Sequence, residues 1–491
     1  MTQQTINIGS APNDGTGDPA RTAFSKTNSN FTELYSTTST LSTTVNYPTT
    51  TSARRINRQA QFPGIIFDGY NLNQFTQQGA NAGGGSINLA TSSTIAEAFD
   101  TANGLAGGSL VTFTQSTTDG TKNILKSPYL NVSSQANLTP YFFTCELSVA
   151  TNKFCTIDLC NETPASLVQV TIGLPNNQIK VTPYSGTTLT VSPTNFDQTK
   201  QFRILIAVMP TSSSAGNIYA YAYYGSASTN ARVFLGTTTY STGTVWMTRF
   251  WVTQGWTATG TMTLARPIVA RISGITMGTS IEAGYDGWSM NPQVPRDSNI
   301  YDVERNPANI LAANFIGSSR PSLSNDWWIN HGMAGYTVAQ MLADLTNWVT
   351  VLAPKRIFVG SATNSVLASL AQANPTAYMT QVKADYLSIC TTALATGARV
   401  CACGVIPRND TTTISYGLAV FATAAKDFNS WAAATLIPLG IPFVDAWTYF
   451  EDPSNVNQLN PTYGASDNVH LNKYGQWKMG QICFETWATF A

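Results

Sequence analysis

Two kinds of hydrophobic pattern follow one another along the chain. Between residues 109 and 267, short runs of β-branched and aromatic residues alternate with polar positions, as in YFFTCELSVA, LVQVTIGL and QFRILIAVMP. Clusters of Pro, Asn, Gly and Ser separate these runs. A period of two is typical of strands, and turn clusters at this spacing are typical of an antiparallel sandwich. The pattern therefore predicts a central β-sandwich over residues 109–267.

After Arg266, strand-like runs alternate with longer segments of helical periodicity. The strand-like runs include IVARISGITMG, RIFVG, ARVCACGVIP and IPFVDAW, and the helical segments include TVAQMLADLTNWVTVL and YGLAVFATAAKDFNSWAAATL. This alternation predicts βαβ units, that is, a three-layer α/β domain with a mostly parallel sheet over residues 268–491. In such sheets ligands bind beyond the carboxyl ends of the strands, so the loops after strands are the candidates for chemistry.

The N-terminal region combines a predicted helix with a polar connector. The helix begins at Asp18, a residue suited to an N-cap, with proline at the first helical position. Two series with a spacing of seven predict a short coiled coil within residues 1–48: Phe24, Phe31, Thr38 and Val45, and Thr27, Leu34 and Leu41. A single amphipathic helix packed on its own chain is the alternative. Residues 49–108 are interpreted as a linker or neck, in which TSSTIAEAFDTANGL can form a short helix.

Charge is sparse and balanced. The 491 residues include 26 Lys and Arg against 26 Asp and Glu, and charged residues make up 11% of the chain. This composition argues against binding to nucleic acid or to an anionic membrane surface. The N-terminus lacks the basic and apolar regions of a secretion signal, and no apolar run is long enough to insert into a membrane. We expect partners that are neutral or are recognised by shape and hydrogen bonding.

The cysteine and histidine content bears on cofactors and compartment. Seven scattered cysteines do not suggest a disulfide framework, and two histidines give little support to a zinc site. We therefore expect buried free thiols, in a protein that folds in a reducing cytosol.

In the predicted sandwich, alternating tyrosines can stack on sugar rings, with ordinary strand surface as the alternative: Tyr219, Tyr221, Tyr223 and Tyr224.

Loops of the α/β region carry residues suited to ester cleavage. That reaction requires a hydroxyl, an imidazole to take its proton, a carboxylate to hold the imidazole, and donors for the oxyanion. Ser280 follows the first strand-like run, in GTSIEAG. Ahead of the terminal helix, DNVHL places Asp467 three residues before His470. The competing histidine, His331, has no carboxylate paired with it in a matching motif.

Taken together, four motifs in residues 270–491 resemble those of the SGNH (GDSL-type) hydrolases. GTSIEAG resembles G-D-S-[LI]-x-x-G, NHGMAGYT resembles N-x-G-x-x-G-x-T, GSATNS resembles a block built on G-x-N, and DNVHL resembles D-x-x-H-L. The resemblance implies Ser280 as nucleophile, with Asp467 and His470 completing a catalytic triad. It also implies an oxyanion hole made by the backbone N–H groups of Ser280 and Gly335 and the Asn364 amide. No metal or organic cofactor is required.

The sequence departs from this family pattern in two places. Thr279 replaces the usual aspartate before the nucleophile, a carboxylate that supports the loop but transfers no proton. Two extra residues separate Gly360 from Asn364, so a neighbouring backbone N–H can substitute for the amide. Turn formation is the alternative role for Gly335, and helix capping is the alternative for Asn364.

Other polar residues of these loops have less specific roles. Asp445 ends a predicted strand and is an alternative orienting acid. Glu282 and Asp286 are interpreted as solvated loop charges or substrate contacts. Arg408, in GVIPRND, is interpreted as a surface-loop residue, with substrate contact as the alternative.

The stretch INIGSAPNDGTGDPARTAFSKTNSNFTELY resembles the start of tailed-phage tail fibres and tailspikes. This resemblance covers about the first 40 residues and implies a homotrimer that attaches to phage baseplate or tail proteins. We therefore predict a virion protein, made in the host cytoplasm, that O-deacetylates a bacterial surface polysaccharide such as capsule or O-antigen. The alternatives are a non-catalytic glycan-binding fibre, a lipase or thioesterase of the same fold, and a polysaccharide depolymerase.

Overall fold

A computed structural model of the chain divides into two compact units, Met1–Ala60 and Gln61–Ala491. It describes residues 22, 26, 27, 65–68, 94–99, 109–115, 122–127, 130, 140–160, 166–212, 214–224, 231–241, 247, 249–254, 260–283, 327–333 and 335–489. In the first unit the three described residues are helical. The heptad positions of the predicted coiled coil lie outside the described residues, apart from Thr27.

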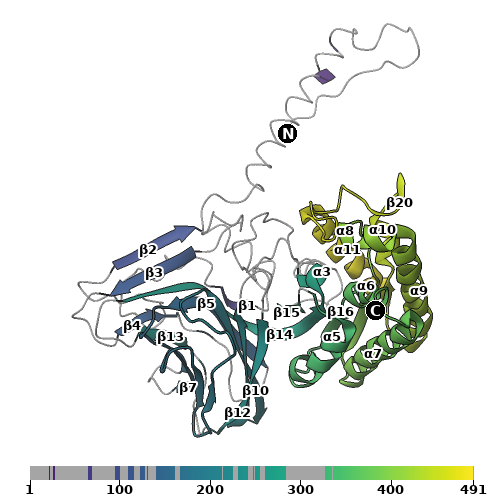
Figure 1. The fold of residues 1–491 in the computed structure, drawn as a ribbon. Coiled ribbons are helices and arrows are strands. Elements are labelled where there is room, and N and C mark those ends of the chain that lie inside the picture. Colours follow the sequence, from purple (N-terminus) through teal and green to yellow (C-terminus); the bar gives the residue numbers. More distant parts are fainter. Residues whose placement is uncertain are drawn as a thin grey trace. The chain divides into compact units, whose positions relative to one another are not determined.

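Two antiparallel sheets share one hydrophobic core, as predicted for the central region (Figure 1). The first sheet has the order β4 (Lys122–Lys126), β13 (Arg249–Gln254), β6 (Cys155–Cys160), β7 (Ser166–Ile172), β8 (Ile179–Pro183) and β9 (Leu189–Val191). The second contains β12 (Ala231–Ser241), β11 (Ala215–Tyr224), β10 (Phe202–Ser212), β5 (Tyr141–Val149) and β14 (Gly260–Gly278). Phe143 and Phe250 join the two sheets, with ring centroids 5.0 Å apart.

Strand β10 of the second sheet is buried on both faces. On β10, Ile204, Ile206 and Val208 point into the core of the sandwich. The intervening Leu205 and Ala207 belong to the other hydrophobic core, that of the α/β region. This explains why the sequence QFRILIAVMP is almost continuously apolar, since a strand covered on both sides has no polar face.

Strand β14 connects the antiparallel and parallel parts of the second sheet. Its first part pairs antiparallel with β5 and with β3 (Ser109–Gln115). It then pairs in parallel with β15 (Trp327–Gly332) from Ile272 and with β16 (Arg356–Val359) from Gly274. β17 (Arg399–Cys403) and β18 (Phe443–Val444) extend the parallel part, which confirms the predicted mostly parallel sheet. The boundary expected after residue 267 falls inside β14, which is continuous but shifts register against β5 between Ala265 and Ile268.

Two short strands lie in the region interpreted as a linker. β1 (Ile65–Asp68) pairs with β14, and β2 (Thr94–Phe99) pairs with β3. The short helix expected in TSSTIAEAFDTANGL is therefore wrong for residues 94–99. An isolated helix of this length is poorly stable, whereas antiparallel pairing with β3 engages alternate backbone groups from Thr94 to Phe99.

Helices pack against the parallel part of the sheet, as the alternating pattern predicted. The longer helices are α5 (Val338–Leu345), α6 (Thr363–Ser369), α7 (Pro375–Ala395), α9 (Leu418–Leu436) and α11 (Lys473–Thr489). The shorter ones are α3 (Ser280–Ala283), α8 (Thr411–Tyr416) and α10 (Ala446–Phe450). Thr337 and Gln340 form a capping box at the start of α5, and Asn374 caps α7 ahead of Pro375. α7 contacts β16 and β17, and α11 contacts β17 and β18.

Tyr221 of β11 joins the sandwich sheet to the α/β region. Its ring lies 4.2 Å from that of Trp348, which belongs to a π-helical turn, η4 (Thr346–Thr350), after α5. Its hydroxyl donates to the Asn347 carbonyl at 2.7 Å. Tyr221 is fully buried, so it is available neither to stack on a sugar ring nor as strand surface.

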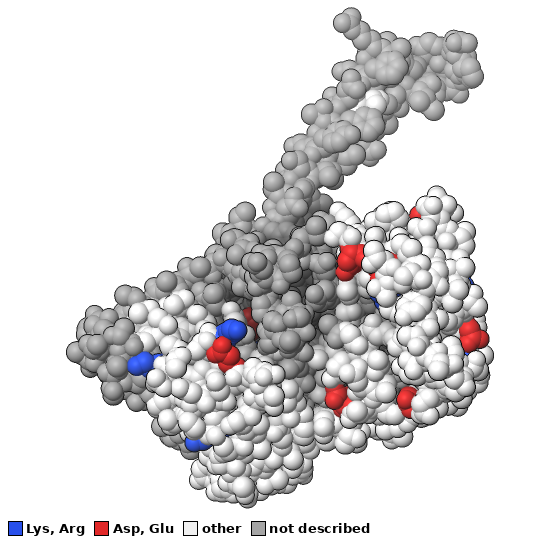
Figure 2. All heavy atoms as spheres, in the orientation of Figure 1, with Lys and Arg blue, Asp and Glu red and all other residues white. Residues whose placement is uncertain are grey.

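The surface and the thiols agree with the composition. All seven cysteines are free and buried, as predicted, and burial raises the pKa of the Cys155 thiol to about 12. On the face shown in Figure 2, the charged side chains of the described residues lie as separate spots among uncharged ones. Among the described helices, none has the length and apolar character needed to cross a membrane.

Candidate active site

Ser280 stands directly beyond the carboxyl end of a parallel strand. β14 ends at Gly278, and α3 begins with Ser280 itself. The end of the strand is buried from Gly274 to Gly278, and the chain turns at Thr279. Ser280 is 5% exposed, so its hydroxyl sits in a largely dehydrated position at the edge of the sheet where α/β proteins bind ligands.

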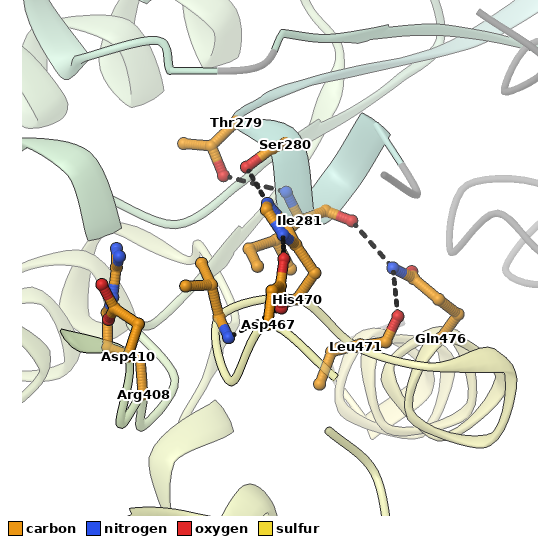
Figure 3. A network of polar contacts seen from close by, with 10 residues as sticks. Thr279, Ser280, Ile281, Arg408, Asp410, Asp467, His470, Leu471 and Gln476 are labelled. Atoms are coloured by element: carbon orange, nitrogen blue, oxygen red, sulfur yellow. Dashed lines mark hydrogen bonds and ion pairs between the residues drawn. The ribbon is translucent and has the colours of Figure 1, made fainter. Parts of the chain in front are cut away.

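A continuous chain of hydrogen bonds joins Ser280, His470 and Asp467 (Figure 3). His470 Nε2 lies 2.8 Å from Ser280 Oγ, and His470 Nδ1 lies 2.5 Å from Asp467 Oδ2. The serine and the histidine are 190 positions apart in the chain. The structure therefore brings together the three side chains that the sequence predicted, in the order hydroxyl, imidazole, carboxylate.

The loop before α11 holds the histidine and the carboxylate in register. Asp467 Oδ1 accepts the backbone N–H groups of Val469 and His470, both at 2.9 Å. The Ala465 N–H donates to the His470 carbonyl at 2.7 Å, which closes the loop. Both carboxylate oxygens of Asp467 are therefore engaged, one by the backbone and one by the imidazole, so the spacing of three residues fixes the pair locally.

The electrostatics favour an ionised Asp467 against the ring. Burial acts to raise the pKa of Asp467, but its interactions with His470 and the N–H of Val469 prevail and hold that pKa well below its ordinary value. A carboxylate at Nδ1 keeps the ring proton on that nitrogen. Nε2 then faces the Ser280 hydroxyl as an acceptor of its proton.

Gly335 and Asn364, which the family resemblance implies for the oxyanion hole, follow β15 and β16, the two strands that pair in parallel with β14. Gly335 precedes α5 and has φ of +76°, a left-handed conformation that favours glycine. Asn364 lies in the first turn of α6, and its amide donates to the Tyr336 carbonyl at 2.9 Å. This bond ties the loop after β16 to the loop that carries Gly335. The amide nitrogen has a second hydrogen, which none of the described residues accepts.

The structure also decides between alternatives for Asn364. α6 begins at Thr363, and its N-cap is Ala362 without a side-chain cap. The helix-capping alternative is therefore wrong, because Asn364 is already inside the helix. The backbone N–H of Ser361 donates to Glu282 Oε1 at 3.0 Å, so that neighbouring N–H is occupied and does not substitute for the amide.

Glu282 is not the solvated loop charge that the sequence suggested. It is completely buried below the nucleophile turn, where it accepts the backbone N–H of Thr279 at 2.7 Å and the Thr279 hydroxyl at 2.9 Å. Burial raises the pKa of Glu282, against the lowering effect of the N–H groups of Ser361 and Thr279. Sequence alone missed this role because the partner loop lies 79 positions away. Asp286, grouped with Glu282, lies outside the described residues.

The second histidine belongs to a different cluster. His331 of β15 is 1% exposed, and its ring stacks on Trp348 at 3.9 Å. It does pair with a carboxylate, since Nε2 lies 2.9 Å from Asp344 Oδ2, and the Tyr336 hydroxyl donates to the same oxygen at 3.0 Å. In this pairing Nε2 bonds to a residue of α5 rather than to Ser280.

The remaining acidic and basic candidates are placed as follows. Asp445 is exposed, and its Oδ2 accepts the Thr448 hydroxyl at 2.7 Å, so it does not orient His470. Arg408 is buried rather than on a surface loop, and its Nε donates to Asp410 at 2.8 Å. Figure 3 shows this pair to one side of the triad. Within the described part of the chain, no three His, Cys, Asp or Glu side chains are grouped so as to hold a metal ion.

No protein-family model matches the chain, and no curated protein matches it significantly. Solved structures similar to it include a lipase/acylhydrolase from Enterococcus faecalis, 15% identical, covering 44% of this chain and 96% of that one, with a TM-score of 0.33. A GDSL-like lipase from Bacteroides thetaiotaomicron is 18% identical over 44% of this chain and 86% of its own, with a TM-score of 0.29. A catalytic mutant of an acetylxylan esterase from Geobacillus stearothermophilus is 13% identical over 44% and 94%, with a TM-score of 0.33.

Proposed function

We propose that this chain is a serine ester hydrolase of the SGNH type. The observation that carries the proposal is the hydrogen-bond chain from Ser280 Oγ through His470 to Asp467. A serine hydroxyl is a weak nucleophile by itself, and an adjacent base oriented by a carboxylate is the arrangement that activates it. The position of Ser280 beyond the end of β14 supports the same role.

The proposed reaction uses Ser280, His470 and Asp467 in turn. Ser280 Oγ attacks the ester carbonyl carbon while its proton passes to His470 Nε2, and the carbonyl oxygen becomes an oxyanion. The C–O bond to the alcohol then breaks, and the alcohol leaves with the proton from His470. Water repeats the sequence on the acyl-enzyme, with His470 again accepting a proton, so the acid is released and Ser280 is restored. Asp467 stabilises the imidazolium formed in both steps.

The oxyanion needs donors already in place. We assign this role to the backbone N–H groups of Ser280 and Gly335 and to the second hydrogen of the Asn364 amide. The bond from Asn364 to the Tyr336 carbonyl supports the assignment, since it fixes the amide beside the loop that carries Gly335. Fixed donors of this kind are effective because they do not reorganise during the reaction.

For the substrate we propose an O-acetylated bacterial surface polysaccharide, capsule or O-antigen. The sparse, balanced charge favours a neutral glycan over nucleic acid or a membrane. The N-terminal resemblance to tail fibres and tailspikes supports a setting on the phage virion, where a homotrimer attached to tail or baseplate proteins acts at the host surface. Sedimentation of the full chain tests the assembly, and a monomer would contradict the trimer.

Acetate release from the surface polysaccharide of the host strain tests the function. Wild type is expected to release acetate, and Ser280→Ala to release none above the blank. Equal release by both proteins would contradict Ser280 as the nucleophile. Binding to the glycan without release by either protein would instead support a non-catalytic receptor-binding fibre, and a preference for long over short acyl esters would favour a lipase.

A further inference from the structure

One buried carboxylate lies below the proposed nucleophile and takes no part in the proton transfers described above. Glu282 is two residues after Ser280 in α3, and its side chain points back into the protein rather than toward solvent, since its exposed fraction is 0%. An ionisable side chain is rarely buried without a structural or functional reason, because dehydrating its charge is costly.

The two oxygens of this carboxylate face two different loops. Oε2 accepts from the N–H and the hydroxyl of Thr279, the residue before the nucleophile. Oε1 accepts from the N–H of Ser361, in the loop after β16 that leads to Asn364. Glu282 therefore joins the turn that presents Ser280 to the loop that presents the proposed oxyanion donor.

The surrounding backbone leaves room for this side chain and for little else. A Cβ added at Gly278 would collide with the Glu282 carboxylate and its stem, and so would a Cβ added at Gly360. These glycines end β14 and follow β16, which are adjacent parallel strands. The space between their ends is thus filled by one carboxylate with a backbone donor on each side.

We propose that Glu282 is a positioning residue of the active site, which holds Ser280 and the oxyanion loop in register. It does the task of the aspartate that precedes the nucleophile in the SGNH pattern and is replaced here by Thr279. This inference rests on the proposed esterase function. A carboxylate is needed because it accepts hydrogen bonds at both oxygens. A glutamine has one oxygen, so its NH₂ group would face either the N–H of Thr279 or that of Ser361, and one of the two connections would become a repulsion.

The test compares Glu282→Gln with Glu485→Gln, a matched control at an exposed glutamate of α11. Hydrolysis of p-nitrophenyl acetate gives kcat and KM, and the initial burst of p-nitrophenol counts the active sites. For Glu282→Gln we expect kcat per active site to fall about 10- to 100-fold with KM within about twofold of wild type, as for a misplaced reacting group. Glu485→Gln is expected to match wild type.

A merely structural role predicts a different result. In that case Glu282→Gln lowers the number of active sites and the melting temperature, while kcat per remaining site stays at the wild-type value, and the inference is overturned. Should Glu282→Gln fail to fold, Glu282→Asp replaces it, because the shorter side chain keeps the charge but does not reach both loops. Unchanged kcat per site in Glu282→Asp overturns the inference as well.

A second readout separates this inference from the proposed function. Diethyl p-nitrophenyl phosphate phosphorylates activated serines and needs no knowledge of the natural substrate. If wild type is not labelled at Ser280, the proposed function itself fails. If wild type and Glu282→Gln are labelled at the same rate, the function stands and the positioning role of Glu282 is refuted. We expect labelling of Glu282→Gln to slow by the same factor as kcat.

Discussion

Replacing Asp467 by asparagine is expected to abolish most of the activity while leaving the loop in place. Asp467 Oδ1 accepts two backbone N–H groups, from Val469 and His470, so the single oxygen of an asparagine is held on that side. The NH₂ group then faces His470 Nδ1, at the position now 2.5 Å away. Since NH₂ is a donor, Nδ1 must become an acceptor, and the ring proton moves to Nε2, facing Ser280.

The expected loss follows from this change of tautomer. An imidazole that carries its proton on Nε2 has no lone pair there for the Ser280 hydroxyl. In serine-protease triads the same substitution lowers kcat about ten-thousandfold, which corresponds to about 5.4 kcal/mol of activation free energy. The assay is kcat for p-nitrophenyl acetate, with circular dichroism to confirm that Asp467→Asn is folded. Asp445→Asn is the matched control, since Asp445 also follows a strand but contacts Thr448 rather than His470. The reasoning is refuted if folded Asp467→Asn keeps more than about a tenth of the wild-type kcat.

Three further predictions concern residues around the triad. Burial raises the folded-state pKa of Glu282 above its ordinary value of 4.5, so its contribution to stability is present below pH 4.5 and is lost as the pH rises through the folded-state pKa. Urea unfolding should therefore show wild type losing stability relative to Glu282→Gln as the pH rises. A constant difference between the two proteins would contradict this. Gly335→Ala should cost about 1 kcal/mol in urea unfolding, since φ is +76° but a Cβ meets no atom within 4 Å, and an unchanged free energy would contradict the strain. Asn364→Ala should lower kcat about 100-fold with little change in KM, and a loss below about threefold would remove Asn364 from the oxyanion hole.

The sequence was sufficient for most of the architecture because its patterns are local. The run RILIAV predicts a strand whether one face or both are buried, and β10 has both faces covered. The triad was also predictable in part, since Asp467 and His470 are three residues apart and their pairing is made within one loop. The continuity of β14 was not predictable, because the strand runs on through Arg266 and Pro267, where the pattern of the sequence changes.

Residues whose role depends on a distant loop escaped the sequence. Glu282 follows a polar turn and looks like a solvated charge, but it binds Thr279 and also the N–H of Ser361, which lies 79 positions away. The pairing of His331 with Asp344 is similar, because a strand and a helix must first come together before the two side chains meet. The alternative of a helix cap at Asn364 is wrong for another reason: the N-cap of α6 is Ala362, two residues earlier, a shift that is usual for predicted helix ends.

If Glu282 replaces an aspartate at position 279, the residues around it must leave room for its side chain. A carboxylate at position 279 would need only a short side chain, because that residue is in the turn itself. A carboxylate at position 282 starts one helical turn later and must reach back, which requires the longer glutamate and open space between the ends of β14 and β16. Gly278 and Gly360 provide that space. The three residues are therefore expected to depend on one another: in a Glu282→Ala background, Gly278→Ala should destabilise the protein less than it does in wild type, and a double-mutant cycle in urea unfolding measures the difference. Additive effects would show that the carboxylate and the glycine are independent.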